Sequence, residues 1–368
     1  MRIVYALLSP TFGMHQYTAD IANRAAAYHE VHLVTTSRYP AHRYAPAVTV
    51  HTPIHTTDTG FSHRALNPAA IRHSLFAIRH LSPDVVHFGG PHLWNVPLIL
   101  GLRRAGIPVI HTLHDLDPHP GSAYGPLLYL WNRQVLRTAD HILIHAVRYQ
   151  ERLLAQGIPA ARLTCTPLLH LFLGHTFLDD VAHLADGVTY APEVLFFGRL
   201  ERYKGVAHLL TAWAMVNPAA TAEAATLVLA GPGDLNRLWS GPLPPGVELR
   251  NRLIDDKEAL ALFKRCSLLV LPYMGGTQSA LIPAAYFFHK PVLASPSGAL
   301  DEYVEDGVTG WVVEPEHPAS LARCLTAALA DLTTLVRMGD AGHAWYEDRR
   351  QAEEQTLLRM YERVNAKT

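Results

Sequence analysis

Short apolar runs alternate with helix-length segments along almost the whole chain. The runs are rich in β-branched residues and apolar without interruption, as strands are when both faces of a sheet are covered. The alternation occurs twice, with a gap between the two series, and it predicts an α/β fold with two doubly wound parallel sheets. The expected strands are residues 3–8, 31–36, 84–88, 108–113 and 141–145, then 194–198, 226–230, 267–271 and 291–295. The expected helices include residues 15–28, 63–81, 131–139, 206–216, 255–264 and 318–332.

The periodicity weakens between residues 168 and 193, where Asp, Gly, Thr and Pro accumulate. We expect the domain junction there, with an N-terminal domain over residues 1–175 and a C-terminal domain over residues 176–345. The charged segment 346–368 is expected to form a helix, either as a solvated end or as a strap that crosses back to the N-terminal domain. Doubly wound sheets bind ligands beyond the carboxyl ends of their strands, so the loops that follow the strands are where a site is expected.

The composition excludes several classes of protein. A chain of 368 residues with 49% hydrophobic and 17% charged residues is long and apolar enough for two packed cores and is not disordered. The formal net charge of −1 provides no basic field for nucleic acid. Three scattered cysteines make no disulfide framework and predict a reducing compartment. The first apolar run is too short for a signal segment, and no run of eighteen apolar residues predicts a membrane span, so a cytoplasmic protein is expected.

One segment is compatible with binding to a membrane surface. Residues 62–80 carry Arg64, Arg72 and Arg79 between apolar residues. This pattern fits the inner membrane surface or an anionic acceptor, although a solvated helix face is the commoner explanation.

The strongest local signal is the segment FFGRLERYKGVAHLL at residues 196–210. A buried strand is expected to end at Gly198, and the loop that follows carries Arg199 and Lys204 before Gly205 opens a helix. Two fixed cations beside a helix start supply the donors and positive charge that a diphosphate needs. An ordinary solvated loop would explain the same residues equally well.

Two further loops expose main chain after expected strands. Gly231 and Gly233, in LVLAGPGDLNRL, allow a flat ligand close to the backbone, although a simple tight turn is the more common reason for two such glycines. In LPYMGGTQSALIPAAYFFHKPV, a helix is expected to start at residues 275–279, where small residues expose amides and hydroxyl groups. A helix-capping turn explains Thr277 and Ser279 but explains the two preceding glycines less well.

The loop PSGALDEYVEDG, after the expected strand 291–295, places Asp301 and Glu302 at a helix start. One of these carboxylates could bind a sugar hydroxyl. It could equally be a charge favoured only by the helix dipole.

In the first half, the segment IPVIHTLHDLDPHPG suggests a metal site because imidazole and carboxylate are metal ligands. Alternate residues of a strand point to opposite faces and no helical i,i+4 pair is present, so a single histidine at the strand exit is the better interpretation. The side chains concerned are His111, His114, Asp115, Asp117 and His119. Gly13 and His15 follow the first strand, and Gly90 follows the third, so both loops are expected near the same edge.

Taken together, these motifs resemble the retaining GT-B glycosyltransferases of family 4, over nearly the whole chain. The resemblance is most specific in GRLERYKG, LAGPGD, LPY, TQSALIPAAYFFHKPVLAS and GALDEYVEDGVTGWVVEP, which occur in the family's order and spacing. It implies two Rossmann-like domains that face each other across a cleft, with the nucleotide-sugar on the C-terminal domain and the acceptor on the N-terminal one. It also implies sugar transfer without a metal or other cofactor and with retention of anomeric configuration.

The resemblance also assigns roles to residues already singled out. Arg199 and Lys204 match the pair that neutralises the diphosphate leaving group, and His114 matches the histidine near the reacting carbon. The residues assigned to donor binding are Gly13, Gly198, Gly231, Gly233, Ile254, Thr277, Gln278, Ser279 and Glu302. The acceptor-side candidates are His15, Gly90 and Asp115.

One departure from the family pattern concerns the ribose. The family usually has two glutamates eight positions apart, and this chain has Gly276 and Ala284 there. Thr277, Gln278 and Ser279 stand in their place, as in a branch of the family with a TQS loop. The expected function is transfer of a UDP- or GDP-linked sugar to a glycan, lipid-linked or small-molecule acceptor. The alternatives are a GT-B scaffold that has lost catalysis and, less consistent with the loop order, an epimerase.

Overall fold

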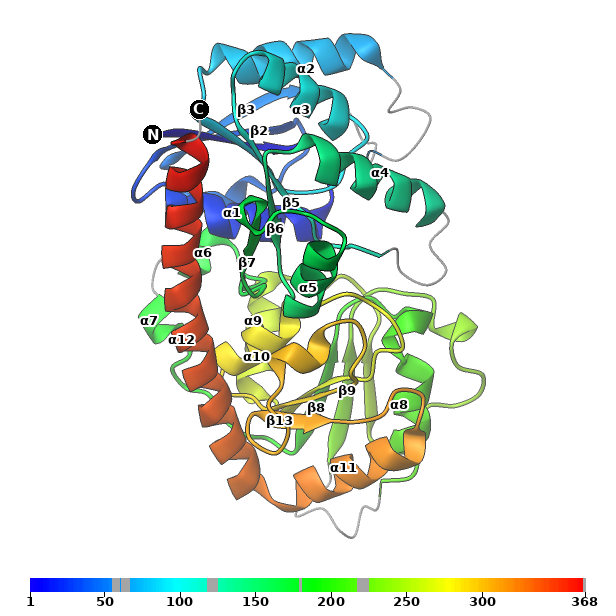
Figure 1. Ribbon diagram of the computed structural model, residues 1–368. Coiled ribbons are helices and arrows are strands. Elements are labelled where there is room, and N and C mark those ends of the chain that lie inside the picture. The colour runs from blue at the N-terminus through cyan, green and yellow to red at the C-terminus, as the bar shows by residue number, and fades with distance from the viewer. Residues whose placement is uncertain (55–59, 61–66, 118–124, 179–180, 217–224, 367–368) are drawn as a thin grey trace. The chain divides into compact units, whose positions relative to one another are not determined.

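The computed structural model describes all residues except 55–59, 61–66, 118–124, 179–180, 217–224 and 367–368. The chain divides into two compact units (Figure 1). Unit 1 comprises Met1–Asp179 with Gln351–Thr368, and unit 2 comprises Asp180–Arg350. Each unit is built around one parallel sheet with interleaved helices, so the expected α/β architecture is confirmed.

Unit 1 contains a seven-stranded sheet in the order β3-β2-β1-β4-β5-β6-β7, and all its neighbouring strands are parallel. The chain moves outward from β1 in one direction and then in the other, which places the topological switch point between β1 and β4. The strands are Arg2–Leu7 (β1), Glu30–Thr36 (β2), Val48–Ile54 (β3), Val85–Phe88 (β4), Val109–Thr112 (β5), His141–Ile144 (β6) and Leu163–Cys165 (β7). The helices of this part are Phe12–Ala25 (α1), Pro68–His80 (α2), Asn95–Arg104 (α3), Gly125–Thr138 (α4), Val147–Ala155 (α5) and His175–Leu178 (α6).

Unit 2 repeats this plan with six parallel strands in the order β10-β9-β8-β11-β12-β13. Its switch point lies between β8 and β11. The strands are Glu193–Phe197 (β8), Thr226–Ala230 (β9), Val247–Arg250 (β10), Leu268–Leu271 (β11), Val292–Ala294 (β12) and Gly310–Val312 (β13). The helices are Val181–Leu184 (α7), Val206–Trp213 (α8), Asp256–Arg265 (α9), Leu281–Phe287 (α10) and Pro318–Ala330 (α11).

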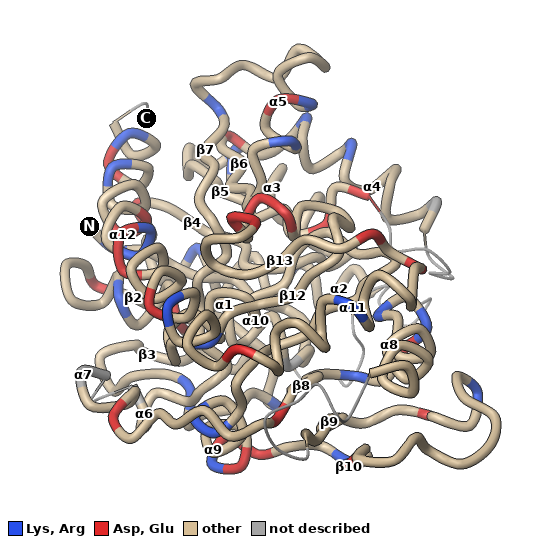
Figure 2. The backbone as a smooth tube through the Cα atoms, turned by 90° about the horizontal axis from the view of Figure 1, so that it is seen from below, with Lys and Arg blue, Asp and Glu red and all other residues tan. Residues whose placement is uncertain are grey.

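The last helix, α12 (Leu332–Asn365), has 34 residues and begins well before the expected position 346. Figure 2 shows acidic and basic residues interspersed along it. Its final part belongs to unit 1, where the Tyr361 hydroxyl lies 2.7 Å from both the Tyr5 hydroxyl and Nδ1 of His87. The buried residues Leu357, Met360, Tyr361 and Val364 recur at helical spacing, which explains why this charged segment packs rather than remaining solvated.

The core of unit 1 is rich in histidine. His15, His87, His111, His114 and His145 are all buried, and burial lowers the pKa of each. Each has a hydrogen-bond partner within the unit; His87, for example, joins Tyr361 to Thr112. These imidazoles are therefore neutral in the folded state, because burial disfavours the charged form.

Among the described residues, no single helix is both long and apolar enough to span a membrane. One pair, α11 with α12, meets the length and composition criteria only when joined across a 99° bend.

Candidate active site

The loops that follow β8 and β11 meet at the switch point of unit 2. The amide of Met274 donates to the carbonyl of Tyr203 at 2.7 Å and so ties one loop to the other. Gly205 has a φ of +71°, and a Cβ added there would lie 1.9 Å from the carbonyl oxygen of Pro272. The two loops therefore approach as closely as backbone can, and glycine is what permits this.

Lys204 lies inside this junction. Its Nζ donates to the Tyr273 hydroxyl at 3.1 Å and lies 5.0 Å from the centre of the Tyr273 ring. A Cβ added to Gly198 would be 2.8 Å from the same Nζ, so the absence of a side chain at Gly198 makes room for the ammonium group. Burial works to lower the pKa of Lys204, but Tyr273 and Tyr203 outweigh it and the pKa is raised, so the group is charged at neutral pH.

Arg199, the other expected cation, has a different environment. Its guanidinium makes an ion pair of 2.6 Å with Glu201, and 65% of its side chain is exposed. It is close enough to Lys204 to be one of the charges that act on the Lys204 pKa. Both cations thus occupy the loop after β8, one half-buried and one at the surface.

Packing explains the two glycines after β9. A Cβ on Gly231 would lie 2.1 Å from the carbonyl oxygen of Gly198, and one on Gly233 would lie 2.5 Å from that of Leu200. The amide of Leu200 donates to the Pro232 carbonyl at 2.8 Å. Both glycines let the loop after β9 lie directly against the loop that carries Lys204, and a donor-binding role for them stays a prediction.

The expectation of a helix starting at residues 275–279 is wrong, because α10 begins at Leu281. Thr277 and Ser279 are buried, and the Ser279 hydroxyl accepts from the amide of Leu281 at 3.4 Å. The Thr277 carbonyl accepts from the amide of Ala299 at 2.8 Å and so joins this loop to the one after β12. Gly276 has a φ of +129°, which other residues rarely adopt, and an added Cβ would make ordinary van der Waals contacts with Tyr273 and Tyr203.

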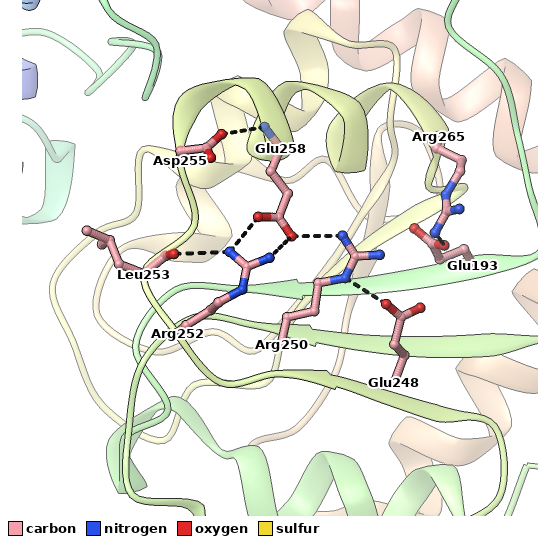
Figure 3. A network of polar contacts seen from close by, with 8 residues as sticks. All are labelled: Glu193, Glu248, Arg250, Arg252, Leu253, Asp255, Glu258 and Arg265. Atoms are coloured by element: carbon pink, nitrogen blue, oxygen red, sulfur yellow. Dashed lines mark hydrogen bonds and ion pairs between the residues drawn. The ribbon is translucent and has the colours of Figure 1, made fainter.

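The remaining donor candidates lie in neighbouring loops of unit 2. Gln278 adjoins Thr277, and Glu302 lies in a single 3-10 turn, Leu300–Tyr303, after β12. Ile254 is half-buried in the loop after β10. Figure 3 shows the ion pairs that hold that loop. The Arg252 guanidinium donates two hydrogen bonds, of 2.7 and 2.9 Å, to the Glu258 carboxylate, and the Arg250 guanidinium pairs with the same carboxylate at 3.0 Å. Sequence reasoning missed Glu258, although its position in the first turn of a helix, shortly after two arginines, was a usable signal.

In unit 1, His114 follows β5 at the edge where the switch point lies. Its Nε2 lies 3.0 Å from the carbonyl oxygen of Gly89, which can only accept, so Nε2 carries the proton. The ring packs edge-on against Tyr17 at 4.6 Å between centres. Burial lowers the pKa of His114, so it enters the site as a neutral imidazole.

The other unit 1 candidates differ in what surrounds them. Gly13 lies in the first turn of α1 rather than in a loop, and a Cβ there would meet nothing within 4 Å among the described residues. Gly90 packs against Leu7 and Met14. His15 is fully buried with Nδ1 2.7 Å from the Tyr44 hydroxyl, and the Asp115 carbonyl accepts from Asn132 at 2.7 Å. His15 therefore has a packing role in the core, and its acceptor role stays a prediction.

The histidine-aspartate segment does not assemble as a cluster. His111 faces Asn95 at 3.0 Å, Asp117 pairs with Arg152 at 2.6 Å, and His119 lies outside the described residues. In the part of the chain that the structure describes, no three His, Cys, Asp or Glu side chains come together to hold a metal ion.

Gly205→Ala is expected to lower the free energy of unfolding of unit 2 by roughly 2–5 kcal/mol, because left-handed strain and a clash with Pro272 add together. Gly187 is the matched control: its φ is +70° and an added Cβ meets nothing within 4 Å, so Gly187→Ala should cost only about 1 kcal/mol. Urea denaturation followed by circular dichroism compares the two. Equal losses of stability would show that the contact between the loops contributes nothing.

Comparison with known proteins adds to this geometry. Residues 12–168 match the model described as "Glycosyl transferase 4-like domain", and residues 191–331 match "Glycosyl transferases group 1". The chain is 27% identical to D-inositol 3-phosphate glycosyltransferase 1 of Catenulispora acidiphila, over 71% of this chain and 68% of that protein. It is 26% identical to the GDP-mannose-dependent alpha-mannosyltransferase of Mycobacterium tuberculosis, over 68% of this chain and 70% of that protein.

Solved structures share the architecture. Sucrose-phosphate synthase from Thermosynechococcus elongatus aligns over all of both chains with a TM-score of 0.75 and 17% identity. Anabaena HepE in complex with UDP-glucose aligns over 100% of this chain and 99% of its own with a TM-score of 0.69 and 16% identity. Two Rossmann-like units with these neighbours define the GT-B fold. The matches over both units place the chain among the GT-B glycosyltransferases of family 4.

Proposed function

We propose that the protein transfers a sugar from a UDP- or GDP-linked donor to an acceptor, without a metal ion and with retention of anomeric configuration. The proposal rests above all on Lys204, a charged ammonium group held at the switch point of unit 2 by Tyr273 and Gly198. A diphosphate leaving group gains negative charge as the sugar departs, and a preorganised cation stabilises that charge more than it stabilises the bound donor.

Freedom from a metal is proposed because the loop after β8 itself supplies two positive charges. Lys204 gives a fixed charge, and Arg199 at the surface gives a second when it exchanges its partner Glu201 for a phosphate. Together they could offset the charge that a divalent cation offsets in other phosphate sites.

Unit 2 is proposed to bind the donor and unit 1 the acceptor, with His114 directed to the donor sugar. The comparisons support both nucleotides. The structural neighbour HepE was solved with UDP-glucose, whereas two relatives are named for GDP-mannose: the GDP-mannose-dependent alpha-mannosyltransferase of Mycobacterium tuberculosis and the GDP-mannose:glycolipid 4-beta-D-mannosyltransferase of Xanthomonas campestris. The names of those two specify alpha and beta transfer respectively, so retention is proposed from the family resemblance alone. In a retaining transfer we expect the acceptor to attack the face that the leaving group departs from, with a phosphate oxygen taking the proton.

Calorimetric titration with UDP, GDP and their sugar conjugates tests the donor proposal. We expect saturable binding of one nucleoside diphosphate without added metal and in the presence of EDTA. Proton NMR of the first product then shows the anomer, and an inverted product would contradict retention. Binding without either transfer or slow hydrolysis would favour a scaffold that has lost catalysis.

A further inference from the structure

Three neighbouring helices of unit 1 carry positively charged side chains and no negatively charged ones. Helix α3 packs between α2 and α4 (Figure 1), and we call these three helices the α2–α4 layer. None of the three helices contains Asp or Glu. The other long helices of the unit all carry acids, such as Asp20 on α1, Glu151 on α5 and Glu353 on α12. The arginines of the layer are Arg72, Arg79, Arg103, Arg104, Arg133 and Arg137.

Most of these arginines are not used to hold the fold. Arg103 is the exception, because it pairs with Asp140 at 2.9 Å and donates to the Thr138 carbonyl at 3.0 Å. Within the described residues, the other five guanidinium groups make no ion pair or hydrogen bond, and all five side chains are exposed. These five cations contribute little to the fold, and their concentration on three adjacent helices gives this layer a positive field that an anionic partner would meet.

Large apolar side chains are exposed among the same arginines. Phe76 is 67% exposed, Leu130 is 55% exposed and Tyr129 is 54% exposed, and Leu127 and Leu100 are also exposed. On α2, Phe76 lies between Arg72 and Arg79 at helical spacing, and on α4 Tyr129 precedes Arg133 and Arg137 at intervals of four. Exposed apolar groups of this size mark an interaction surface when they gather rather than occur singly.

We propose that the α2–α4 layer binds the surface of an anionic phospholipid membrane. The side chains of the layer favour a membrane over a nucleic acid. The arginines would bind the phosphates of either partner, but the exposed Phe and Leu side chains would have no apolar surface to contact on a nucleic acid. At a bilayer, the apolar side chains enter the boundary of the acyl chains while the guanidinium groups meet the phosphates of the head groups. The surface is distinct from the loops around Lys204, and its test needs no catalytic activity.

Flotation with vesicles tests the proposal on the full-length protein. We expect binding to vesicles of phosphatidylcholine mixed with phosphatidylglycerol, weaker binding at high salt, and little binding to phosphatidylcholine alone. The variant R133Q/R137Q removes two exposed, unpaired charges and should weaken partitioning about 25-fold, at about fivefold for each arginine. The variant F76S/L130S keeps every charge and should weaken it by about tenfold or more.

The matched control is R323Q/R337Q, which removes two exposed arginines from α11 and α12 in unit 2. It should bind anionic vesicles as the parent does. Absence of binding, equal binding to both kinds of vesicle, or an equal loss in the control would overturn the proposal. So would a dimer in sedimentation velocity that F76S/L130S abolishes in a protein that binds no vesicles, because the layer would then be an interface between copies.

Discussion

Lys204→Ala is expected to lower kcat/KM for sugar transfer by about 150-fold or more, equivalent to about 3 kcal/mol of transition-state stabilisation. The reason is that the Nζ of Lys204 is already charged and held by Tyr273 before the donor arrives, so no reorganisation is needed as the leaving group gains charge. Steady-state kinetics with the nucleotide-sugar identified by calorimetry measure the effect, and affinity for the nucleoside diphosphate should fall as well.

Lys264→Ala is the matched control for this variant. It also removes a lysine charge from unit 2, but Lys264 lies at the C-terminal end of α9 and donates to the Asp186 carbonyl at 2.8 Å. Since α9 leads into the start of β11, this end of the helix is at the edge of the sheet remote from the loops around Lys204. Turnover of Lys204→Ala within a few-fold of the parent would remove Lys204 from the mechanism.

Unit 1 is expected to lose stability steeply as the pH falls from 6.5 towards 4, while unit 2 is much less affected. Burial lowers the pKa of His15 to about 4 and that of His111 to about 3, and it lowers those of His87, His114 and His145 as well. Because the folded pKa values lie below the unfolded value, the unfolded chain binds more protons in this window and stability falls with falling pH. A histidine whose folded pKa lies well below 5, such as His15 or His111, costs on the order of 1–2 kcal/mol of stability between pH 6.5 and pH 5.

The pKa values of the other three buried histidines are lowered as well, so protonation of the five together should remove a large part of the stability of an ordinary domain. Hydrogen exchange read by mass spectrometry, corrected for the intrinsic pH dependence of exchange, resolves the two units. Peptides from β1, β4 and β5 should lose protection near pH 5, whereas peptides from β8 and β11 serve as the internal control. Equal protection of the unit 1 peptides at pH 5 and pH 7 would show that these histidines do not control its stability.

The strands that could be predicted from the sequence are those at the centre of each sheet. All four strands that were missed, β3, β7, β10 and β13, lie at the edges of the two sheets. An edge strand has one neighbour and can be short or polar: β10 reads VELR, and β7 and β13 have three residues each. The uninterrupted apolar pattern that marks a central parallel strand is therefore absent there.

In the candidate site, too, features that are local in the sequence could be predicted and contacts between distant segments could not. Lys204 and Gly198 could be predicted because a strand, a glycine and a cation stand close together in the sequence. Tyr273 could not be assigned as the partner of Lys204, since 69 residues separate the two and only the neighbouring positions of β8 and β11 join them. The sequence left open whether Gly231 and Gly233 admit a ligand or form a simple turn, and only the structure shows that the carbonyl groups of the loop after β8 lie against them.

Two parallel sheets and the loops that follow their central strands can be predicted from the amino-acid sequence, because buried strands and glycine-bearing turns are local patterns. The fold is needed to show which loops touch, which histidines become core residues and which arginines have no partner among the described residues. Those outcomes depend on the order of strands in a sheet and on what lies next to each side chain, and neither is encoded in the spacing of residues along the chain.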